Sequence, residues 1–390
     1  MALKKIVHVV PYYWPAFRYG GPVWSVHGLC RAQANLGYEV EVLTTNMDGP
    51  KNLNVATHEV VELDGVKVRY FPVPYLRRLA WSPAMKREFP KSIASADFLH
   101  LHTIFQWPSF AAAKIAARFN VPWCIAPRGA LVPEMVERKS TLIKKTWLSW
   151  FDRAMLEGAS FIHATSELEA QDLQRFPYRY QHIEIVPNGV EFVSVSEASL
   201  PDELAIWING RPLLLFLGRV SWKKGLDRLI SALQAVPEAV LIVAGNDEEN
   251  YTPALIDLAT KVGVAERVRF IGAVQGTLKT TLLANASLLV LPSYSENFGN
   301  VILESLAQAR PVAVTPEVGL AAWIAAQNVG VILPTEAQAM GENLAQLINN
   351  PSRLNEMGAL GRDRVQQEYS WTGIAVNMIQ AYQKAIDVHK

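Results

Sequence analysis

Residues 286–306 read ASLLVLPSYSENFGNVILESL, and this stretch indicates the fold more strongly than any other part of the chain. It starts with a short apolar run that ends at Pro292, as expected for a strand covered on both faces. A polar loop follows, and an apolar pattern with helical spacing begins near Asn300. A buried strand, a loop and a helix in this order form the repeating unit of a doubly wound parallel sheet.

Two carboxylates bracket the expected helix N-terminus. Glu296 lies in the loop, and Glu304 lies eight residues later within the helix. Phosphate groups bind well at a helix N-terminus, because free backbone N–H groups and the positive end of the helix dipole point at them. Phe298 and Gly299 precede the helix and let the backbone come close to a ligand. The stretch therefore predicts a phosphate-binding loop that leads into Asn300.

A second stretch, LLFLGRVSWKKG at residues 214–225, repeats this arrangement. Its apolar run ends at Gly218, and Arg219 and Lys224 follow within six positions. Two cations beside the end of a strand suit a diphosphate. The alternative is an exposed basic loop. Cations are unfavourable at a helix N-terminus, however, and a bound anion would explain a lysine just before the next helical pattern.

The apolar runs fall into two series, separated by a turn-rich stretch near residues 190–210. Helical patterns lie between the runs in both series. We therefore expect an α/β protein with two doubly wound domains, residues 1–192 and residues 193–370. The expected strands lie within residues 4–10, 39–45, 67–73, 97–102, 123–127 and 160–166 of the first series, and 212–218, 239–245, 268–272, 286–292 and 311–315 of the second.

Composition and charge narrow the range of partners. The chain has 390 residues, half of them hydrophobic, and a net charge of +1, which indicates no nucleic acid partner. Residues 1–192 carry 22 Lys and Arg against 17 Asp and Glu, whereas residues 193–390 carry 15 against 19. The N-terminal half is therefore the half expected to face an anionic surface.

The sequence shows no sign of secretion or of a metal site. Cys30 and Cys124 lie in apolar surroundings, which favours buried free thiols over a disulfide framework. The first apolar run is too short for the hydrophobic region of a signal peptide, and no stretch of 18 apolar residues occurs. We expect a cytoplasmic location.

Further motifs support a family resemblance. Together with the two loop segments, they resemble the retaining glycosyltransferases of family 4, and nearly the whole chain is covered. The resemblance implies the GT-B fold, in which two Rossmann-like doubly wound domains face a central cleft. It also implies that the C-terminal helix, residues 371–390, packs back on the N-terminal domain. The motifs are HVVPYYWPAFRYGGP at 8–22, ADFLHLHT at 96–103, IVPNGVE at 185–191 and YSWTGIAVNMIQAYQKAI at 369–386.

The resemblance assigns roles to residues of the C-terminal half. It implies that Arg219 and Lys224 bind the donor diphosphate and that Glu304 accepts hydrogen bonds from the ribose hydroxyls. Glu296 is implied to lie near the donor sugar as a catalytic residue. Phe298, Gly299 and Asn300 belong to the donor-binding loop, and Val274 would hold the base through backbone contacts.

The N-terminal half supplies four further candidates. Gly20 and Gly21 resemble the loop that touches the donor phosphate, although a simple turn is the alternative. His102 ends an apolar run and is implied to lie near the donor sugar as a catalytic residue, whereas a core histidine is the commoner case. Arg128 suits a carboxylate or phosphate and is expected to bind the acceptor, unless it forms a structural salt bridge.

These candidates predict a retaining, hexosyltransferase-type enzyme. It would move a sugar from a nucleotide diphosphate to a hydroxyl of a saccharide or lipid-linked acceptor, in surface polysaccharide or other glycan biosynthesis. Neither a metal nor a cofactor is expected, because protein cations and the helix N-terminus would neutralise the diphosphate. The alternatives are a nucleotide-sugar epimerase and a non-catalytic, glycosyltransferase-like binding subunit. One departure from the family is Leu320–Ala322, where many relatives have an acidic residue after the glycine.

Residues 138–153, RKSTLIKKTWLSWFDR, are basic and aromatic with helix-like spacing. They could lie on an anionic membrane, which would give the N-terminal domain a peripheral membrane contact. The alternative is a helix with Trp147, Trp150 and Phe151 in the core or along the acceptor site. The sequence leaves both interpretations open.

Overall fold

The computed structural model describes residues 3–57, 59–138, 141–195, 198–247 and 249–389. The chain divides into two compact units, Met1–Gly189 with Trp371–Lys390, and Val190–Ser370. The backbone N–H of Val190 donates to the Tyr369 carbonyl at 2.9 Å, and Val190 forms a parallel bridge with Ser370. These contacts group the residues directly after Gly189 with the second unit.

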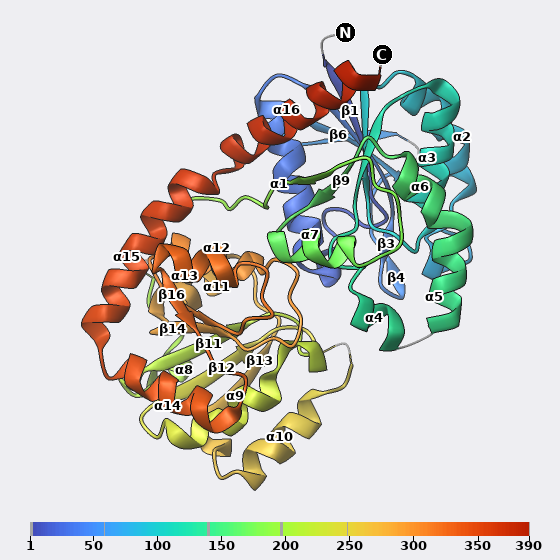
Figure 1. The fold of residues 1–390 in the computed structure, drawn as a ribbon. Helices are drawn as coiled ribbons and strands as arrows, with labels where there is room; N and C mark the ends of the chain where they lie inside the picture. The colour runs from blue at the N-terminus through green and yellow to red at the C-terminus, as the bar shows by residue number, and fades with distance from the viewer. Residues whose placement is uncertain (1–2, 58, 139–140, 196–197, 248, 390) are drawn as a thin grey trace. The chain divides into compact units, whose positions relative to one another are not determined.

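The first unit is built on an eight-stranded sheet in the order β10-β9-β8-β7-β1-β2-β6-β5 (Figure 1). All neighbouring strands are parallel except β5 and β6. The strands are β1 Lys5–Val9, β2 Glu39–Thr45, β5 Val60–Leu63, β6 Val66–Phe71, β7 Phe98–His102, β8 Trp123–Ala126, β9 Phe161–Ala164 and β10 Ile183–Ile185, and β3 Met47–Asp48 and β4 Lys51–Asn52 form a separate small hairpin. The helices are α1 Gly21–Asn35, α2 Pro83–Ala94, α3 Trp107–Phe119, α4 Pro133–Arg138, α5 Thr141–Trp147, α6 Arg153–Gly158, α7 Glu167–Gln174 and α16 Trp371–His389.

Helices cover both faces of this sheet. Along β1, Val7 and Val9 pack in a cluster with residues of α2, α3 and α6, whereas Ile6 packs with residues of α1 and α16. Successive residues of a strand point to opposite faces, so the two clusters lie on opposite sides of the sheet. This double burial explains why the central strands are continuous apolar runs.

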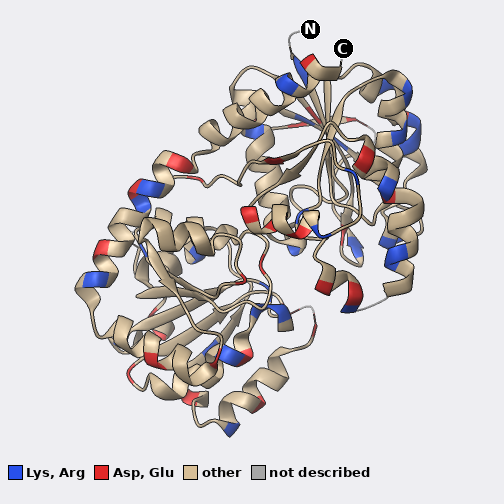
Figure 2. Cartoon of the chain, in the orientation of Figure 1, with Lys and Arg blue, Asp and Glu red and all other residues tan. Residues whose placement is uncertain are grey.

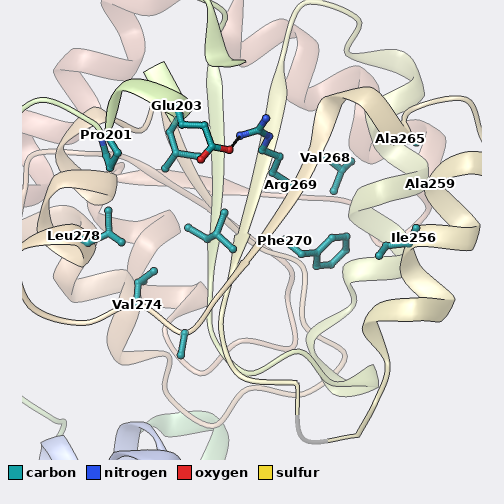
Figure 3. A pocket seen from close by; sticks show the side chains of 13 residues that line it. Pro201, Glu203, Ile256, Ala259, Ala265, Val268, Arg269, Phe270, Val274 and Leu278 are labelled. Atoms are coloured by element: carbon teal, nitrogen blue, oxygen red, sulfur yellow. Dashed lines mark hydrogen bonds and ion pairs between the residues drawn. The ribbon is translucent and has the colours of Figure 1, made fainter. Parts of the chain in front are cut away.

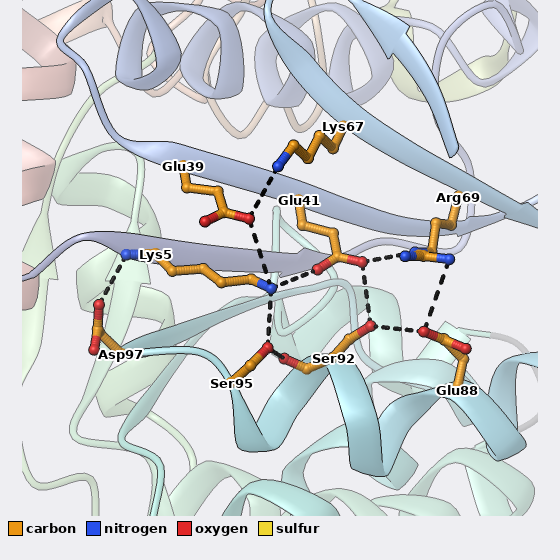
Figure 4. Close-up of polar contacts among 9 residues, drawn as sticks. All are labelled: Lys5, Glu39, Glu41, Lys67, Arg69, Glu88, Ser92, Ser95 and Asp97. Atoms are coloured by element: carbon orange, nitrogen blue, oxygen red, sulfur yellow. Dashed lines mark hydrogen bonds and ion pairs between the residues drawn. The ribbon is translucent and has the colours of Figure 1, made fainter. Parts of the chain in front are cut away.

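A polar network joins the strands β1, β2 and β6 to α2 (Figure 4). The Glu41 carboxylate accepts hydrogen bonds from Arg69 Nε at 2.8 Å and Ser92 Oγ at 3.1 Å, and it pairs with Lys5 Nζ at 3.0 Å. Burial raises the pKa of the Glu41 carboxyl, but its hydrogen bonds and charge interactions with Lys5 and Arg69 bring the pKa below its ordinary value. The network gives the buried Glu41 carboxylate both cationic partners and hydrogen bonds, and a buried charge requires such partners.

The second unit has a six-stranded parallel sheet in the order β13-β12-β11-β14-β15-β16. Its core is a cluster of buried hydrophobic residues that includes all of β11, β12 and β14. The strands are β11 Leu213–Leu217, β12 Val240–Ala244, β13 Val268–Gly272, β14 Leu288–Leu291, β15 Val312–Val314 and β16 Gly330–Ile332. The helices are α8 Asp202–Ile208, α9 Leu226–Ala232, α10 Thr252–Lys261, α11 Gly276–Asn285, α12 Asn300–Ala307, α13 Ala321–Gln327, α14 Ala337–Ile348 and α15 Pro351–Glu368.

The predicted fold class, two doubly wound Rossmann-like domains, is confirmed. A strand overlaps each predicted apolar run, although β6 begins one residue before its run, at Val66. The strands β3, β4 and β5 were not predicted, nor were the two short strands β10 and β16. Both have three residues and are only partly buried at the edge of a sheet, so they lack the long apolar run that identifies a central strand.

Candidate functional site

The strand order of the second unit creates a switch point between β11 and β14. Counted in chain order its strands read 3-2-1-4-5-6, so the helical connections change face between these two neighbours. Ligands of doubly wound sheets bind at such a switch point, outside the carboxyl ends of the strands. The loop after β11 carries Arg219 and Lys224, and the loop after β14 carries Glu296.

Lys224 and Glu296 form an ion pair at this switch point. Lys224 Nζ donates to Glu296 Oε2, and both side chains are largely buried, at 16% and 18% exposure. Arg219 is exposed and lies two residues after the end of β11. The structure thus brings together a predicted diphosphate-binding cation and the predicted sugar-site carboxylate. It gives Lys224 a carboxylate partner, which the sequence did not reveal.

Glu304 lies in α12, and its carboxylate also has a cationic partner. Lys279 Nζ of α11 lies 2.7 Å from Glu304 Oε2. Phe298 is buried, Gly299 is the N-cap of α12 with a left-handed backbone, φ +88°, and Asn300 is the first helical residue. Lys279 was missed by the sequence analysis, because nothing local distinguishes it from other exposed lysines of a helix.

Aromatic and charged contacts support the loop after β14. The Tyr294 hydroxyl donates to Asp227 Oδ2 at 2.8 Å, and the guanidinium of Arg228 lies 3.6 Å from the centroid of the Tyr294 ring. The loop backbone is held as well, since Glu296 N–H donates to the Glu317 carbonyl at 3.1 Å and Gly319 N–H donates to the Glu296 carbonyl at 2.9 Å. Residues of α9 and of the segment after β15 therefore hold the loop that carries Glu296.

Gly225 allows the two loops to meet. Its φ is +64°, and a Cβ at this position would lie 1.9 Å from the carbonyl oxygen of Pro292. No side chain fits there, because the neighbouring atom belongs to the backbone of β14's carboxyl end. The glycine after Lys224 is therefore what lets the β11 loop approach the β14 loop.

Two hollows lie further along the same sheet. One, of about 320 Å³, follows the ends of β11 and β12, and Val220, Gly245 and Asp247 contribute to its lining. The other, of about 650 Å³, runs along β13 and is mainly apolar, with Arg269 Nη1 donating to Glu203 Oε1 at 2.9 Å (Figure 3). Val274 lines this second hollow. Lys224, Glu296 and Glu304 are not among the residues that line it.

The first unit has a switch point of its own, between β1 and β7. The segment after β1 leads to Gly20, the N-cap of α1 with φ +73°, and to Gly21, the first residue of α1. His102 is the last residue of β7 and is fully buried. Arg128 follows the neighbouring strand β8. The predicted residues of the N-terminal half thus gather at one edge of one sheet.

Arg128 contacts residues from three other segments of this unit. Its guanidinium donates to Ser25 Oγ at 3.1 Å, to Asn188 Oδ1 at 3.3 Å and to His102 Nδ1 at 3.3 Å. Burial lowers the pKa of Arg128 to about 10, while the Glu169 carboxylate opposes this shift. Arg128 keeps its positive charge at neutral pH, and no carboxylate forms a salt bridge with it among the described residues.

Three buried histidines lie together behind Arg128. Ring nitrogens of His8, His100 and His102 all lie within 4.8 Å of one another, a spacing that a metal ion could bridge. Both nitrogens of each ring already have hydrogen-bond partners, however. A cation would have to replace these bonds beside the charge of Arg128, so the cluster is better described as a hydrogen-bonded network.

Aromatic residues surround the glycine loop, and the sequence analysis did not assign them a role. Phe17 and Trp24 stack with ring centroids 4.8 Å apart, and Trp14 meets both rings edge-on. Trp24 keeps 40% of its surface exposed. The high aromatic content of residues 12–24 is the signal that could have identified this cluster, since an exposed aromatic face can pack against a sugar ring.

Comparisons with known proteins agree with this architecture. The family model "Glycosyl transferase 4-like domain" matches residues 20–189, and "Glycosyl transferases group 1" matches residues 206–364. An uncharacterized glycosyltransferase of Methanocaldococcus jannaschii is 25% identical over 98% of this chain and 99% of its own length. Sucrose-phosphate synthase from Thermosynechococcus elongatus has a TM-score of 0.76 at 20% identity, over 99% of this chain and 100% of its own. Anabaena HepE in complex with UDP and glucose has a TM-score of 0.74 at 18% identity, over 98% and 100%.

The fold and the two matched halves define a GT-B glycosyltransferase. Both family models fall on the doubly wound units described above, in the order that this class requires. The chain belongs to the family-4 type of glycosyltransferases, which confirms the resemblance seen in its motifs.

Proposed function

We propose that the protein is a retaining, metal-independent glycosyltransferase that moves a sugar from a nucleotide diphosphate to a hydroxyl of a saccharide or lipid-linked acceptor. The observation that supports this proposal most strongly is the Lys224–Glu296 ion pair at the switch point between β11 and β14. It places a cation suited to phosphate beside a carboxylate suited to sugar hydroxyls. This combination fits a phosphorylated sugar better than either group alone.

In this proposal the second unit binds the donor. The diphosphate takes the place of Glu296 as the partner of Lys224, with Arg219 as a second cation, and the released carboxylate faces the donor sugar. Glu304 accepts from the ribose hydroxyls, and backbone groups near Val274 hold the base. The UDP and glucose in the Anabaena relative support a nucleotide diphosphate sugar as the donor.

Thermal-shift measurements against nucleoside diphosphates and their sugars test the donor site. A ligand at 100 times its Kd should stabilise the protein by about 2.7 kcal/mol by mass action. Nucleoside diphosphates should stabilise the protein more than nucleosides do, because Lys224 and Arg219 bind the phosphates. Equal shifts from both would show that the phosphates are not recognised.

Metal independence rests on the protein cations at the diphosphate. Activity should persist in EDTA, because Lys224, Arg219 and the N-terminus of α12 neutralise the leaving phosphate. Activity that disappears in EDTA and returns with magnesium or manganese would contradict this part of the proposal.

Retention of the anomeric configuration is a separate expectation. Glu296 is held near the diphosphate-binding lysine, and no side chain of the described second unit has been identified as a base for attack from the back face. Proton NMR of the fresh product should show an α-linkage from an α-linked donor. A β-linked product would assign an inverting mechanism instead.

The first unit would receive the acceptor. Arg128 is a charged donor at the switch point, and no carboxylate of the described residues forms a salt bridge with it, so it suits an acidic or phosphorylated acceptor group. The exposed face of Trp24 could pack on an acceptor sugar. Such acceptors occur in surface polysaccharide and other glycan biosynthesis, which is the setting that we propose.

A peripheral membrane contact is part of this proposal. The segment predicted as one basic helix is divided into α4, α5, a π-helical turn at Leu148–Asp152 and α6, and residues 139–140 lie outside the described residues. Leu142, Ile143 and Trp150 expose 81%, 70% and 76% of their surface, so Trp150 does not lie in the core. Blue segments on α2 and α5 mark nearby lysines and arginines (Figure 2). Among the described helices, none is both long and apolar enough to cross a bilayer.

Vesicle co-sedimentation tests this contact. The protein should bind vesicles with anionic phosphatidylglycerol more tightly than neutral phosphatidylcholine vesicles, because cations and exposed apolar side chains act together. Replacing Leu142, Ile143 and Trp150 by serine should abolish binding. A matched control replaces Ile206 and Val388, which are 77% and 81% exposed elsewhere. Equal binding by both variants would exclude this surface.

A further inference from the structure

A continuous path of hydrogen bonds leads from Arg128 into the core of the first unit. Arg128 Nη2 lies 3.3 Å from His102 Nδ1, and His102 Nε2 lies 3.0 Å from His8 Nδ1. His8 Nε2 lies 2.8 Å from Gln33 Oε1. The imidazoles of His8 and His102 and the Gln33 amide are fully buried, so protein groups rather than solvent determine where their protons lie.

The path continues through the C-terminal helix. Gln33 Nε2 donates to the Tyr382 hydroxyl at 3.3 Å, and this hydroxyl lies 2.6 Å from His100 Nδ1. His100 Nε2 lies 3.3 Å from His163 Nδ1, and His163 Nε2 lies 2.7 Å from the Val186 carbonyl oxygen. Strands β1, β7 and β9 and helices α1 and α16 thus contribute to one chain of contacts.

The two ends of this path fix the direction of every hydrogen bond within it. Arginine can only donate, so His102 Nδ1 must accept. A neutral His102 then carries its proton on Nε2 and donates to His8, and His8 donates in turn to the Gln33 oxygen. At the other end, the carbonyl of Val186 can only accept. His163 therefore carries its proton on Nε2, and the same reasoning runs back through His100 to the Tyr382 hydroxyl.

All four imidazoles are neutral in this arrangement. Burial lowers the pKa of His8 to about 4, and burial with the charge of Arg128 lowers the pKa of His163 to about 3. Burial also brings the pKa values of His100 and His102 well below the ordinary range, with charges of neighbouring groups adding to the effect. Each ring therefore has one proton, and the geometry assigns it to Nε2 in every case.

We propose that Gln33 and Tyr382 are positioning residues that preset His102 as the Nε2–H tautomer, so that its Nδ1 lone pair receives and orients the Arg128 guanidinium. His102 is then a holder of Arg128 and not a general base, because its proton sits on Nε2 and its lone pair is occupied. The assignment of Arg128 to an acceptor rests on the proposed function. The tautomers do not, since they follow from the hydrogen bonds alone.

Long-range ¹H–¹⁵N NMR of the histidine rings in the full-length protein tests this inference. At pH 7 the four buried rings should all give the pattern of a neutral Nε2–H tautomer. An imidazolium or an Nδ1–H tautomer at His102 would overturn the proposal. The readout needs no substrate, so it is independent of whether the protein transfers the sugar proposed above.

Two variants separate the presetting path from the influence of Arg128. In Arg128→Met the intact path should keep His102 as Nε2–H, because Gln33 still accepts from His8. Adding Tyr382→Phe removes the hydroxyl that orients the Gln33 amide, while the ring can keep its stack on Phe98, 4.4 Å between centroids. In that double variant the amide can rotate, and the His102 signals should shift to a mixture of tautomers.

The matched control is Arg128→Met combined with Tyr70→Phe. The Tyr70 hydroxyl donates to the Trp14 carbonyl, so its loss also removes a partly buried tyrosine hydrogen bond of this unit but leaves the path intact. His102 should remain Nε2–H in the control. A mixture already in Arg128→Met, or an unchanged His102 in the double variant with Tyr382→Phe, would overturn the role of Gln33 and Tyr382.

Discussion

At the scale of single residues, the candidate donor site is a set of compensated charges. Glu296 pairs with Lys224, and Glu304 pairs with Lys279. A partly buried charge is costly without a partner, so each carboxylate keeps its lysine in place when no ligand is bound. In the proposed donor site, a diphosphate would replace Glu296 as the partner of Lys224, so donor binding would be coupled to the release of Glu296.

Lys224→Ala should therefore weaken binding of a nucleotide diphosphate sugar. The loss of a charge-assisted hydrogen bond costs about 1.5–3 kcal/mol, or roughly 10- to 100-fold in Kd. Isothermal titration calorimetry measures this change directly. Lys261→Ala at the exposed end of α10 is the control and should bind like the wild type. An equal affinity for Lys224→Ala would remove this lysine from the donor site.

At the scale of elements, the loops after β11 and β14 depend on close backbone approach. Gly225 and Gly263 both have positive φ, +64° and +75°, but only Gly225 faces a backbone atom at which a Cβ would clash. Gly263 has nothing within 4 Å of the position that a Cβ would take. Substituting each of these two glycines by alanine therefore separates the free-energy cost of the backbone conformation from the cost of a steric clash.

We predict that Gly263→Ala loses about 1 kcal/mol of unfolding free energy, because alanine disfavours this backbone region. Gly225→Ala should lose a further ~1–3 kcal/mol, because the loop must move away from Pro292. Urea denaturation monitored by circular dichroism gives both values. Similar losses in the two variants would show that the β11 loop accommodates the methyl group without strain.

The π-helical turn at Leu148–Asp152 supports the loop after β7. Asp152 is fully buried, and its Oδ2 accepts from the Phe105 backbone N–H at 2.9 Å. Thr103 and Phe105 have positive φ values of +74° and +61°, an unfavourable conformation that this bond helps to hold. Burial raises the pKa of Asp152 to about 7, although the hydrogen bond from the Phe105 N–H opposes the shift.

This raised pKa predicts a pH dependence of stability. The folded state binds the Asp152 proton more tightly than the unfolded state, whose ordinary pKa is 3.8. Protonation of Asp152 therefore contributes to the free energy of unfolding. This contribution is fully present below about pH 4 and is lost as the pH rises through about 7, by up to ~1.4 kcal/mol per pH unit. Asp152→Asn keeps an acceptor for Phe105 and should remove this slope from urea unfolding curves. Asp202→Asn, an exposed carboxyl of α8, is the control and should keep the wild-type slope.

At the scale of the whole molecule, the chain returns to its first unit at the end. Helix α16 buries Ile374, Met378 and Tyr382 in that unit, and Trp371 lies so close to Gly28 that a Cβ there would be 2.4 Å from the indole. The core of the N-terminal unit is therefore incomplete until the last residues are present.

Deleting residues 371–390 should unfold the first unit. Each large apolar side chain removed from its core forfeits about 1.5–3 kcal/mol, and several such losses approach the total stability of a domain. Limited proteolysis should then degrade residues 1–189 before residues 190–370. Ending the chain at Asp387 removes only the exposed end of the helix and should leave the digestion pattern unchanged. A resistant first unit in the long deletion would show that α16 is dispensable for folding.

The sequence by itself determined the fold class, the positions of the central strands and the family. Strands buried on both faces must be continuous apolar runs, and helices between them must be amphipathic, so the local pattern is sufficient. It also indicated which loops carry charged and glycine residues, because carboxyl ends of parallel strands are where a doubly wound sheet binds ligands.

Only the tertiary structure decided the partners of these residues. Lys224 and Glu296 are 72 positions apart, and His100 and Tyr382 are 282 apart. Such contacts depend on strand order and on the return of α16, neither of which leaves a local pattern in the chain. The sequence pattern of a histidine at the end of a strand is the same whether the side chain faces a ligand or the core. At His102 the surroundings are decided by the buried path of hydrogen bonds, which forms only when the strands and helices have folded around it.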